Sequence, residues 1–285
     1  MRAEAEASTD ALAHRFHVAS LTAPAWCHRC QRFLWGLRGQ AHECQLCQRL
    51  ACTACAALGE RCPSLETADG AGMLNDVGSV RGERGDLEGA LEAYREAQSL
   101  REATGTLTTA EGAKLLRNMG TARRAKGDYA GALEAYEEAR SIHETLGTLE
   151  TPSGAVLVRS IGTVKGDQGD LNGAFEAYGE ARRIHAATGS LETPEGAGLL
   201  ASLGYARAER GDITGALDAY QEARAVRERT GTLETLAGAR LLKSLGVARR
   251  VAGDSEAALA AFAEARRAFE FSGTLETPGG AGLLR

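Results

Sequence analysis

Eight residues near the start of the chain have the types and the spacing of metal ligands. All seven cysteines lie between residues 27 and 62, and six of them form three Cys-x2-Cys pairs. Such a pair places two thiolates on one tight turn, where they can occupy two corners of a tetrahedron. With one histidine added, the set suffices for two closed zinc sites. The eight residues are His14, Cys27, Cys30, Cys44, Cys47, Cys52, Cys55 and Cys62.

Eight ligands shared by two ions leave no coordination position open for water. We therefore expect two structural Zn²⁺ ions that fold the segment and catalyse nothing, which argues against a zinc hydrolase or ligase. The alternative for the cysteines is a set of buried or oxidised thiols. No apolar signal-peptide core precedes the segment, and no run approaches the ~18 apolar residues of a membrane span. We expect a reducing, cytoplasmic location, where paired cysteines usually bind metal.

The full spacing, His-x12-Cys-x2-Cys-x13-Cys-x2-Cys-x4-Cys-x2-Cys-x6-Cys, resembles the C1 domain of the protein kinase C type. Pro24, the triplet 34–36 (Leu-Trp-Gly) and Gln40 match landmarks of that family. Cys52 stands where the family has a second histidine, a change that preserves zinc binding. The resemblance implies interleaved sites, one with His14, Cys44, Cys47 and Cys62 and the other with Cys27, Cys30, Cys52 and Cys55. A FYVE-like or RING-like cross-brace is the competing zinc fold. Such a fold would need a fourth pair of ligands near Cys62, which this chain lacks.

The resemblance also implies a lipid site on two ligand-free loops, at about residues 22–26 and 32–38. In diacylglycerol-responsive C1 domains these loops form a groove with an apolar rim that inserts into the bilayer. The residues that match are Leu21, Pro24, Trp26, Phe33, Leu34, Trp35, Gly36, Leu37 and Gln40. Aromatic rings favour the membrane interface, and nearby arginines favour anionic headgroups. We expect reversible binding to diacylglycerol-bearing membrane. The alternative is a C1 domain that folds around zinc and binds no lipid.

The charge of the chain is divided unevenly. Residues 14–62 hold six arginines and two glutamates, a net charge of +4, although the whole chain has a net charge of −5. Only the small segment therefore favours anionic surfaces, and nucleic acid is not an expected partner of the acidic remainder.

After Cys62 the sequence repeats with a period of 42 residues. Leu-Glu-Thr or its variant recurs from residue 65 to residue 275, and Gly-Ala-Leu-Glu-Ala-Tyr at 89–94 returns with small changes at 131, 173, 215 and 257. A period of this length predicts a solenoid. The expected organisation is a short segment 1–13, a zinc domain 14–62, five repeats 65–274 and a truncated sixth repeat 275–285. We expect a longer array in the natural protein.

Each unit predicts two helices. A threonine N-cap opens the first helix, and a Gly-Asp pair such as Gly85-Asp86 ends it and caps the second. The pattern Leu-x2-Leu-Gly at 200–204, followed by Ala216-x3-Tyr220 and Ala223, resembles the tetratricopeptide repeat in the form of kinesin light chains. The fold class is then mainly α, a tetratricopeptide-type α-solenoid preceded by a small zinc-stapled, β-rich C1-like domain.

The resemblance implies a groove, lined by the first helices, that binds a peptide or protein. One position of each first helix is expected to face it, and its occupants are Asn75, Arg117, Arg159, Ala201 and Lys243. The three bases favour an acidic peptide, although ordinary solvated side chains fit the pattern equally. His143 and His185 lie 42 residues apart, so they are one repeat position and no catalytic pair. The sequence thus predicts a non-enzymatic, membrane-recruited adaptor; the alternative is a protein-binding scaffold with a purely structural zinc domain.

Overall fold

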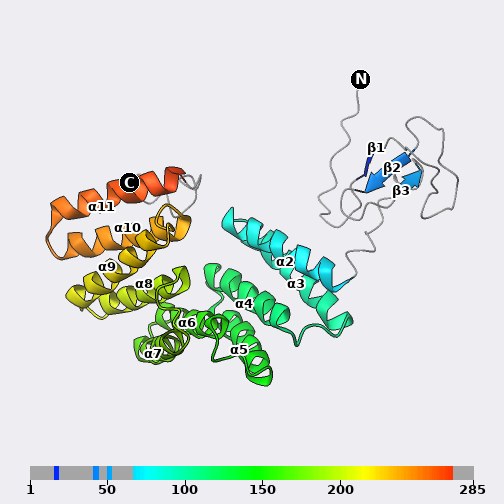
Figure 1. Cartoon of the computed structure of the whole chain (residues 1–285), viewed down its shortest axis with the longest axis horizontal. Helices are drawn as coiled ribbons and strands as arrows, with labels where there is room; N and C mark the ends of the chain where they lie inside the picture. The colour runs from blue at the N-terminus through cyan, green and yellow to red at the C-terminus, as the bar shows by residue number, and fades with distance from the viewer. Residues whose placement is uncertain (1–15, 19–40, 45–49, 53–66, 272–285) are drawn as a thin grey trace.

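The computed structural model of the protein describes residues 16–18, 41–44, 50–52 and 67–271 (Figure 1). Three short strands, β1 (Phe16–Val18), β2 (Ala41–Cys44) and β3 (Leu50–Cys52), form an antiparallel sheet in chain order. Cys44 lies opposite Phe16, and Cys52 lies opposite Ala41. Because Ala41 and Cys44 are the two ends of β2, the two cysteines are about 10 Å apart along the strand direction.

Ten helices in five pairs make up the array from residue 68 to residue 271 of the described chain. The first helices, of 16 residues each, are α2 (Ala68–Glu83), α4 (Ala110–Ala125), α6 (Pro152–Asp167), α8 (Pro194–Glu209) and α10 (Leu236–Val251). The second helices, of 17 residues each, are α3 (Leu87–Ala103), α5 (Tyr129–Thr145), α7 (Leu171–Ala187), α9 (Ile213–Arg229) and α11 (Ser255–Phe271). The predicted helical solenoid is confirmed from residue 68 onward.

The helix boundaries follow the predicted caps. Oγ1 of Thr67 accepts a hydrogen bond from the amide of Gly70 at 3.2 Å, and the four equivalent threonines do the same at 3.3–3.5 Å. Oδ1 of Asp86 accepts from the amide of Gly89 at 2.9 Å. Gly85 has φ +85°, a left-handed conformation that ends the first helix with little steric cost for glycine. The Gly-Asp pairs thus separate the two helices of each repeat.

The glycine of the Leu-x2-Leu-Gly pattern is required by an aromatic ring. A Cβ atom at Gly78 would lie 2.5 Å from Cε1 of Tyr94, and one at Gly162 would lie 2.8 Å from Cε1 of Tyr178. These distances are far below van der Waals contact, so a side chain there would push the two helices apart. The ring and the glycine together fix the close approach of the first and second helix in every repeat.

Each first helix carries two apolar stripes. On α6, Ala155 and Val158 join Tyr178 of the same repeat in one buried cluster. Leu157 and Ile161 instead join Tyr136 of the preceding repeat in another. Because each first helix after α2 contacts the pair before it as well as its own partner, the core is continuous along the array.

The five pairs follow an arc, with the first helices on its inner side and the second helices outside (Figure 1). Neighbouring first helices contact one another directly (α2 with α4, α4 with α6, α6 with α8, α8 with α10). None of the described helices is long and apolar enough to cross a membrane.

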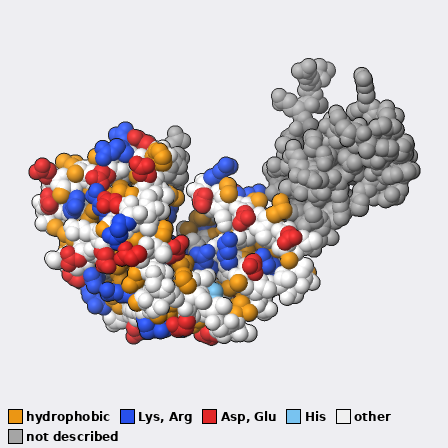
Figure 2. Space-filling view, viewed as in Figure 1, with side chains coloured by type: hydrophobic (Ala, Val, Ile, Leu, Met, Phe, Trp, Pro, Cys, Tyr) orange, Lys and Arg blue, Asp and Glu red, His pale blue; other side chains and the backbone are white. Residues whose placement is uncertain are grey.

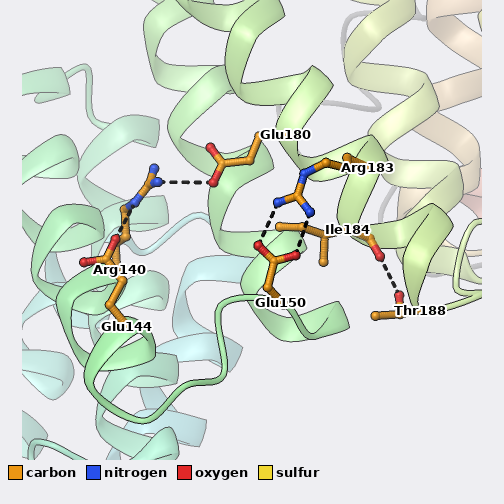
Figure 3. A network of polar contacts seen from close by, with 7 residues as sticks. All are labelled: Arg140, Glu144, Glu150, Glu180, Arg183, Ile184 and Thr188. Carbon is orange, nitrogen blue, oxygen red and sulfur yellow. Dashed lines mark hydrogen bonds and ion pairs between the residues drawn. The ribbon is translucent and has the colours of Figure 1, made fainter.

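Ion pairs lie on the outer surface, and one of them, Arg140 with Glu180, joins neighbouring repeats (Figure 3). Arg140 on α5 binds Glu144 at 3.0 Å and reaches Glu180 on α7 at 3.1 Å. Arg183 on α7 donates two hydrogen bonds to Glu150, at 2.7 and 2.8 Å. These pairs are largely solvated, so each contributes little to stability, roughly 0–1 kcal/mol.

Candidate protein-binding groove

The inner side of the arc encloses a cavity of about 1110 Å³, visible as a hollow in the surface (Figure 2). Its walls come mostly from α4, α6, α8 and α10, with contributions from α2, α7 and α9. Because side chains from both the beginning and the end of the array reach it, the groove is a product of the whole arc.

The structure places the predicted groove residues in different surroundings. Arg117 and Arg159 line the cavity, as does Ala201 at the same position of α8. Asn75 is buried, and its Oδ1 accepts a hydrogen bond from the side-chain amide of Asn118 at 3.0 Å. Lys243 is half-buried and lies outside the lining of the cavity. The structure therefore brings together two of the four predicted polar residues.

Arg117 and Arg159 are cations without a counter-charge. No described residue forms a hydrogen bond or ion pair with either guanidinium, and Nε of Arg159 is buried without a partner. Burial lowers the pKa of both side chains, and the nearby charge of Arg117 lowers the pKa of Arg159 further. Arginine still carries its charge at neutral pH, so this wall of the groove holds desolvated positive charge that an anion would stabilise.

Other bases that the sequence analysis did not select also line the groove. Arg124 binds Asp167 at 2.8 Å. Across the groove, burial and the charge of Arg124 lower the pKa of Arg240. Arg227 also lines the cavity, where burial lowers its pKa and the charge of Glu195 partly opposes that effect. The sequence could not predict that these three arginines line the groove, because an arginine on a helix surface has no distinctive pattern. Only the arc of the whole array brings α4 opposite α10.

The two histidines are structural. Nδ1 of His143 hydrogen-bonds Oγ1 of Thr148 at 2.8 Å, and Nδ1 of His185 hydrogen-bonds Oγ of Ser190 at 2.7 Å. Burial lowers the pKa of both rings; the charges of Arg117 and Arg159 contribute. The two imidazoles make the same contact in the turn after the second helix of their repeats. This agrees with the prediction that they occupy one repeat position.

Tyr205 adds an exposed aromatic ring to the groove. In the first three repeats a hydroxyl at this position hydrogen-bonds the tyrosine of the second helix, as Thr163 does with Tyr178 at 3.3 Å. In the fourth repeat Tyr205 replaces that hydroxyl, and Tyr220 hydrogen-bonds Ser244 of the next repeat instead. Burial raises the pKa of Tyr220 to about 12. The Tyr205 ring is therefore left exposed in the groove.

Most of the predicted zinc and lipid residues lie outside the described residues. Of the eight expected ligands, Cys44 and Cys52 lie on described strands. The expected lipid residues, Leu21 to Gln40, and the partial sixth repeat are not covered. Within the described parts of the chain, no group of three or more His, Cys, Asp or Glu residues could hold a metal ion.

Comparison with known proteins supports the fold. Residues 71–145 match the family model of the tetratricopeptide repeat. The array resembles BtubC from P. vanneervenii, with 20% identity, a TM-score of 0.53, and coverage of 69% of this chain and 78% of that one. A kinesin light chain-like protein of Podosopora anserina has 17% identity, a TM-score of 0.52 and coverage of 69% and 93%. A search of curated sequences finds no match.

The highest of these TM-scores, 0.66, belongs to a plasmid Rap conjugation gene regulator solved in complex with a Phr peptide. Its identity to this chain is 15%, and the alignment covers 74% of this chain and 55% of that one. At these identities the likeness concerns the fold. The array is a helical solenoid of the tetratricopeptide-like kind, and its residues 71–145 match the tetratricopeptide repeat itself.

Proposed function

We propose that the protein is a non-enzymatic adaptor whose repeat array binds an acidic segment of a protein partner in its groove. The observation that carries the proposal is the pair Arg117 and Arg159, two half-buried guanidiniums in the groove that no described carboxylate pairs with. Carboxylates of a bound peptide would supply the missing counter-charges by charge-assisted hydrogen bonds. The Rap regulator, whose array has a similar fold, was solved with a peptide bound.

Fluorescence anisotropy with labelled peptides tests this proposal. A glutamate-rich ten-residue peptide is expected to bind, and a lysine-rich peptide of equal length is not. The double variant Arg117→Ala, Arg159→Ala should weaken binding at least tenfold, about 1.4 kcal/mol. The control removes two arginines from the outer surface, Arg140→Ala with Arg183→Ala, and should bind normally. Equal affinity of both variants, or tight binding of the lysine-rich peptide, would contradict the proposal.

For residues 14–62 we propose two structural zinc ions, on the strength of the ligand spacing. The residue types are those that zinc prefers, and the backbone register is compatible with two separate sites. Two sulfurs bound to one zinc lie roughly 4 Å apart because each Zn–S bond is about 2.3 Å. Cys44 and Cys52 lie at opposite ends of β2, about 10 Å apart along the strand, which suits their assignment to different ions.

Zinc content of the purified full chain tests the assignment. The expected value is two ions per chain, released together with loss of folded structure on strong chelation. Cys52→Ala should lower the content, and Cys52→His should restore it because imidazole can replace a thiolate as a ligand. A chain with two zinc ions whose content is unaffected by Cys52→Ala would place Cys52 outside the sites.

The membrane role is a further part of the proposal, and it rests on the apolar loop residues of the C1-like pattern. Sedimentation with liposomes should show binding that depends on diacylglycerol. Trp35→Gly should abolish this binding while zinc content stays at two, because the ring belongs to the rim rather than to a metal site. If the wild-type chain retains both ions and ignores diacylglycerol, the zinc domain is structural and the protein is a scaffold.

A further inference from the structure

Helix α2 exposes the face that every later first helix uses for stacking. Leu115, Met119 and Ala122 of α4 are 0%, 2% and 6% exposed because they pack on the pair α2–α3. The residues at the same repeat positions of α2 are Met73, Val77 and Val80, and they are 41%, 36% and 48% exposed. We call these three residues the α2 stacking face. It lies at the first helix of the arc (Figure 1).

Three polar positions beside this face also reach back toward the preceding unit. On α4, Asn118 donates a hydrogen bond to Asn75 of the first repeat at 3.0 Å. On α6, Asp167 accepts one from Arg124 of the second repeat at 2.8 Å. Lys126, which follows α4, binds Glu88 of the first repeat. The equivalent residues of the first repeat are Asp76, Glu83 and Arg84, all exposed. The face of α2 that a preceding unit would cover is therefore apolar, with two acids and one base on its border.

The acid at position 76 is peculiar to the first repeat. The later repeats have Asn118, Ser160, Ser202 and Ser244 at the same position, all neutral. A covering repeat that met this position with a neutral group, as Asn75 meets Asn118, would leave the Asp76 carboxylate desolvated without a counter-charge. The α2 stacking face is thus suited to a basic partner.

We propose that residues 14–62 of the same chain dock on the α2 stacking face and take the place of a preceding repeat. This segment has a net charge of +4, which complements the net acidic border, and it contains both tryptophans. Its apolar residues include Phe33 and Leu34 of the lipid rim proposed above, so docking on Met73 and its neighbours and binding to membrane would exclude each other. The segment thus offers both kinds of group that the face requires.

The connection is short enough to favour this contact over one with another molecule. Residues 63–67 join Cys62 to the start of α2 and span at most about 18 Å. The stacking face begins at Met73, about 8 Å along the helix axis from Ala68. A short tether holds the segment at an effective concentration in the millimolar range, far above that of a second copy in dilute solution.

Small-angle scattering and limited trypsin digestion of the full, zinc-loaded chain test the docking. The double variant Val77→Asp, Val80→Asp should increase the radius of gyration and speed cleavage at the arginines of residues 14–62 at least threefold. The matched control, Leu259→Asp, changes an exposed leucine on α11 at the other end of the array and should leave both readings unchanged. Circular dichroism verifies that each variant keeps its helices.

A second pair of variants tests the charge complement without altering the apolar face. Asp76→Arg with Glu83→Arg should have the same effect as the apolar variant, whereas Glu209→Arg, at the position of Glu83 in the fourth repeat, should not. Readings of the α2 variants equal to those of the controls would overturn the proposal. So would a mass that rises with concentration in analytical ultracentrifugation and returns to monomer in the Val77→Asp, Val80→Asp variant, because a second copy would then cover the face.

Discussion

Two arginines on the inner surface of the arc differ from two on its outer surface in whether they have carboxylate partners. Outside, Arg140 and Arg183 bind carboxylates of neighbouring elements in water. Inside, Arg117 and Arg159 lie in a partly desolvated groove without such partners. Paired surface charges link repeats at little gain in stability, whereas unpaired, desolvated charges cost stability and are useful when a ligand neutralises them. This contrast supports the proposal that the groove binds an anionic ligand.

The largest effect that this comparison predicts is a gain in stability on removing a groove cation. Arg159→Met keeps the volume of the side chain and removes the desolvated charge, so the free energy of unfolding should rise by about 2 kcal/mol. Urea denaturation followed by circular dichroism measures it. A loss of stability would mean that an unrecognised partner holds Arg159 in the unliganded protein.

The second prediction concerns a neutral polar group beside the groove. Tyr178→Phe removes the hydroxyl that Thr163 hydrogen-bonds at 3.3 Å, and it should lower the free energy of unfolding by about 1 kcal/mol. Tyr205→Phe is the matched control, since that ring is exposed and should show almost no change. The same urea titrations compare the two. Equal effects would show that burial does not distinguish the two hydroxyls.

The third prediction is a dependence of stability on pH. His143 and His185 have lowered pKa values in the folded chain because burial disfavours the charged ring. The unfolded chain then binds more protons near pH 6, so stability is full above the unfolded pKa of about 6.5 and falls as the pH falls through it. The double variant His143→Asn, His185→Asn should flatten the change in Tm between pH 7.5 and pH 5.5. An unchanged slope would assign the dependence to other groups.

The smallest effect is expected on the outer surface. Arg140→Ala removes two solvated ion pairs and should lower the free energy of unfolding by at most about 1 kcal/mol, with less loss at 1 M salt because screening weakens both pairs. Denaturation at low and high salt measures this difference. A loss larger than that of Tyr178→Phe would show that the outer network holds the arc together.

Much of the array could be predicted from local rules. The threonine and aspartate caps, the left-handed Gly85 and the glycine that faces Tyr94 act within one or two turns of the chain, so their sequence signals are direct. The groove was only partly predicted. Arg117 and Arg159 were selected by their repeat position, but the same rule selected Asn75, which is buried against Asn118 because the first helices of neighbouring repeats touch there.

The sequence by itself determined the period of 42 residues, the two helices of each repeat, their ends and the cysteine spacing that motivates the zinc proposal. Only the tertiary structure decided which polar residues meet. Arg124 and Arg240 are more than one hundred residues apart and share a cavity because the stacked repeats follow an arc. Likewise, the open face of α2 follows from its place at the start of the arc. Local interactions set the elements, and the accumulated rotation from one repeat to the next sets the groove.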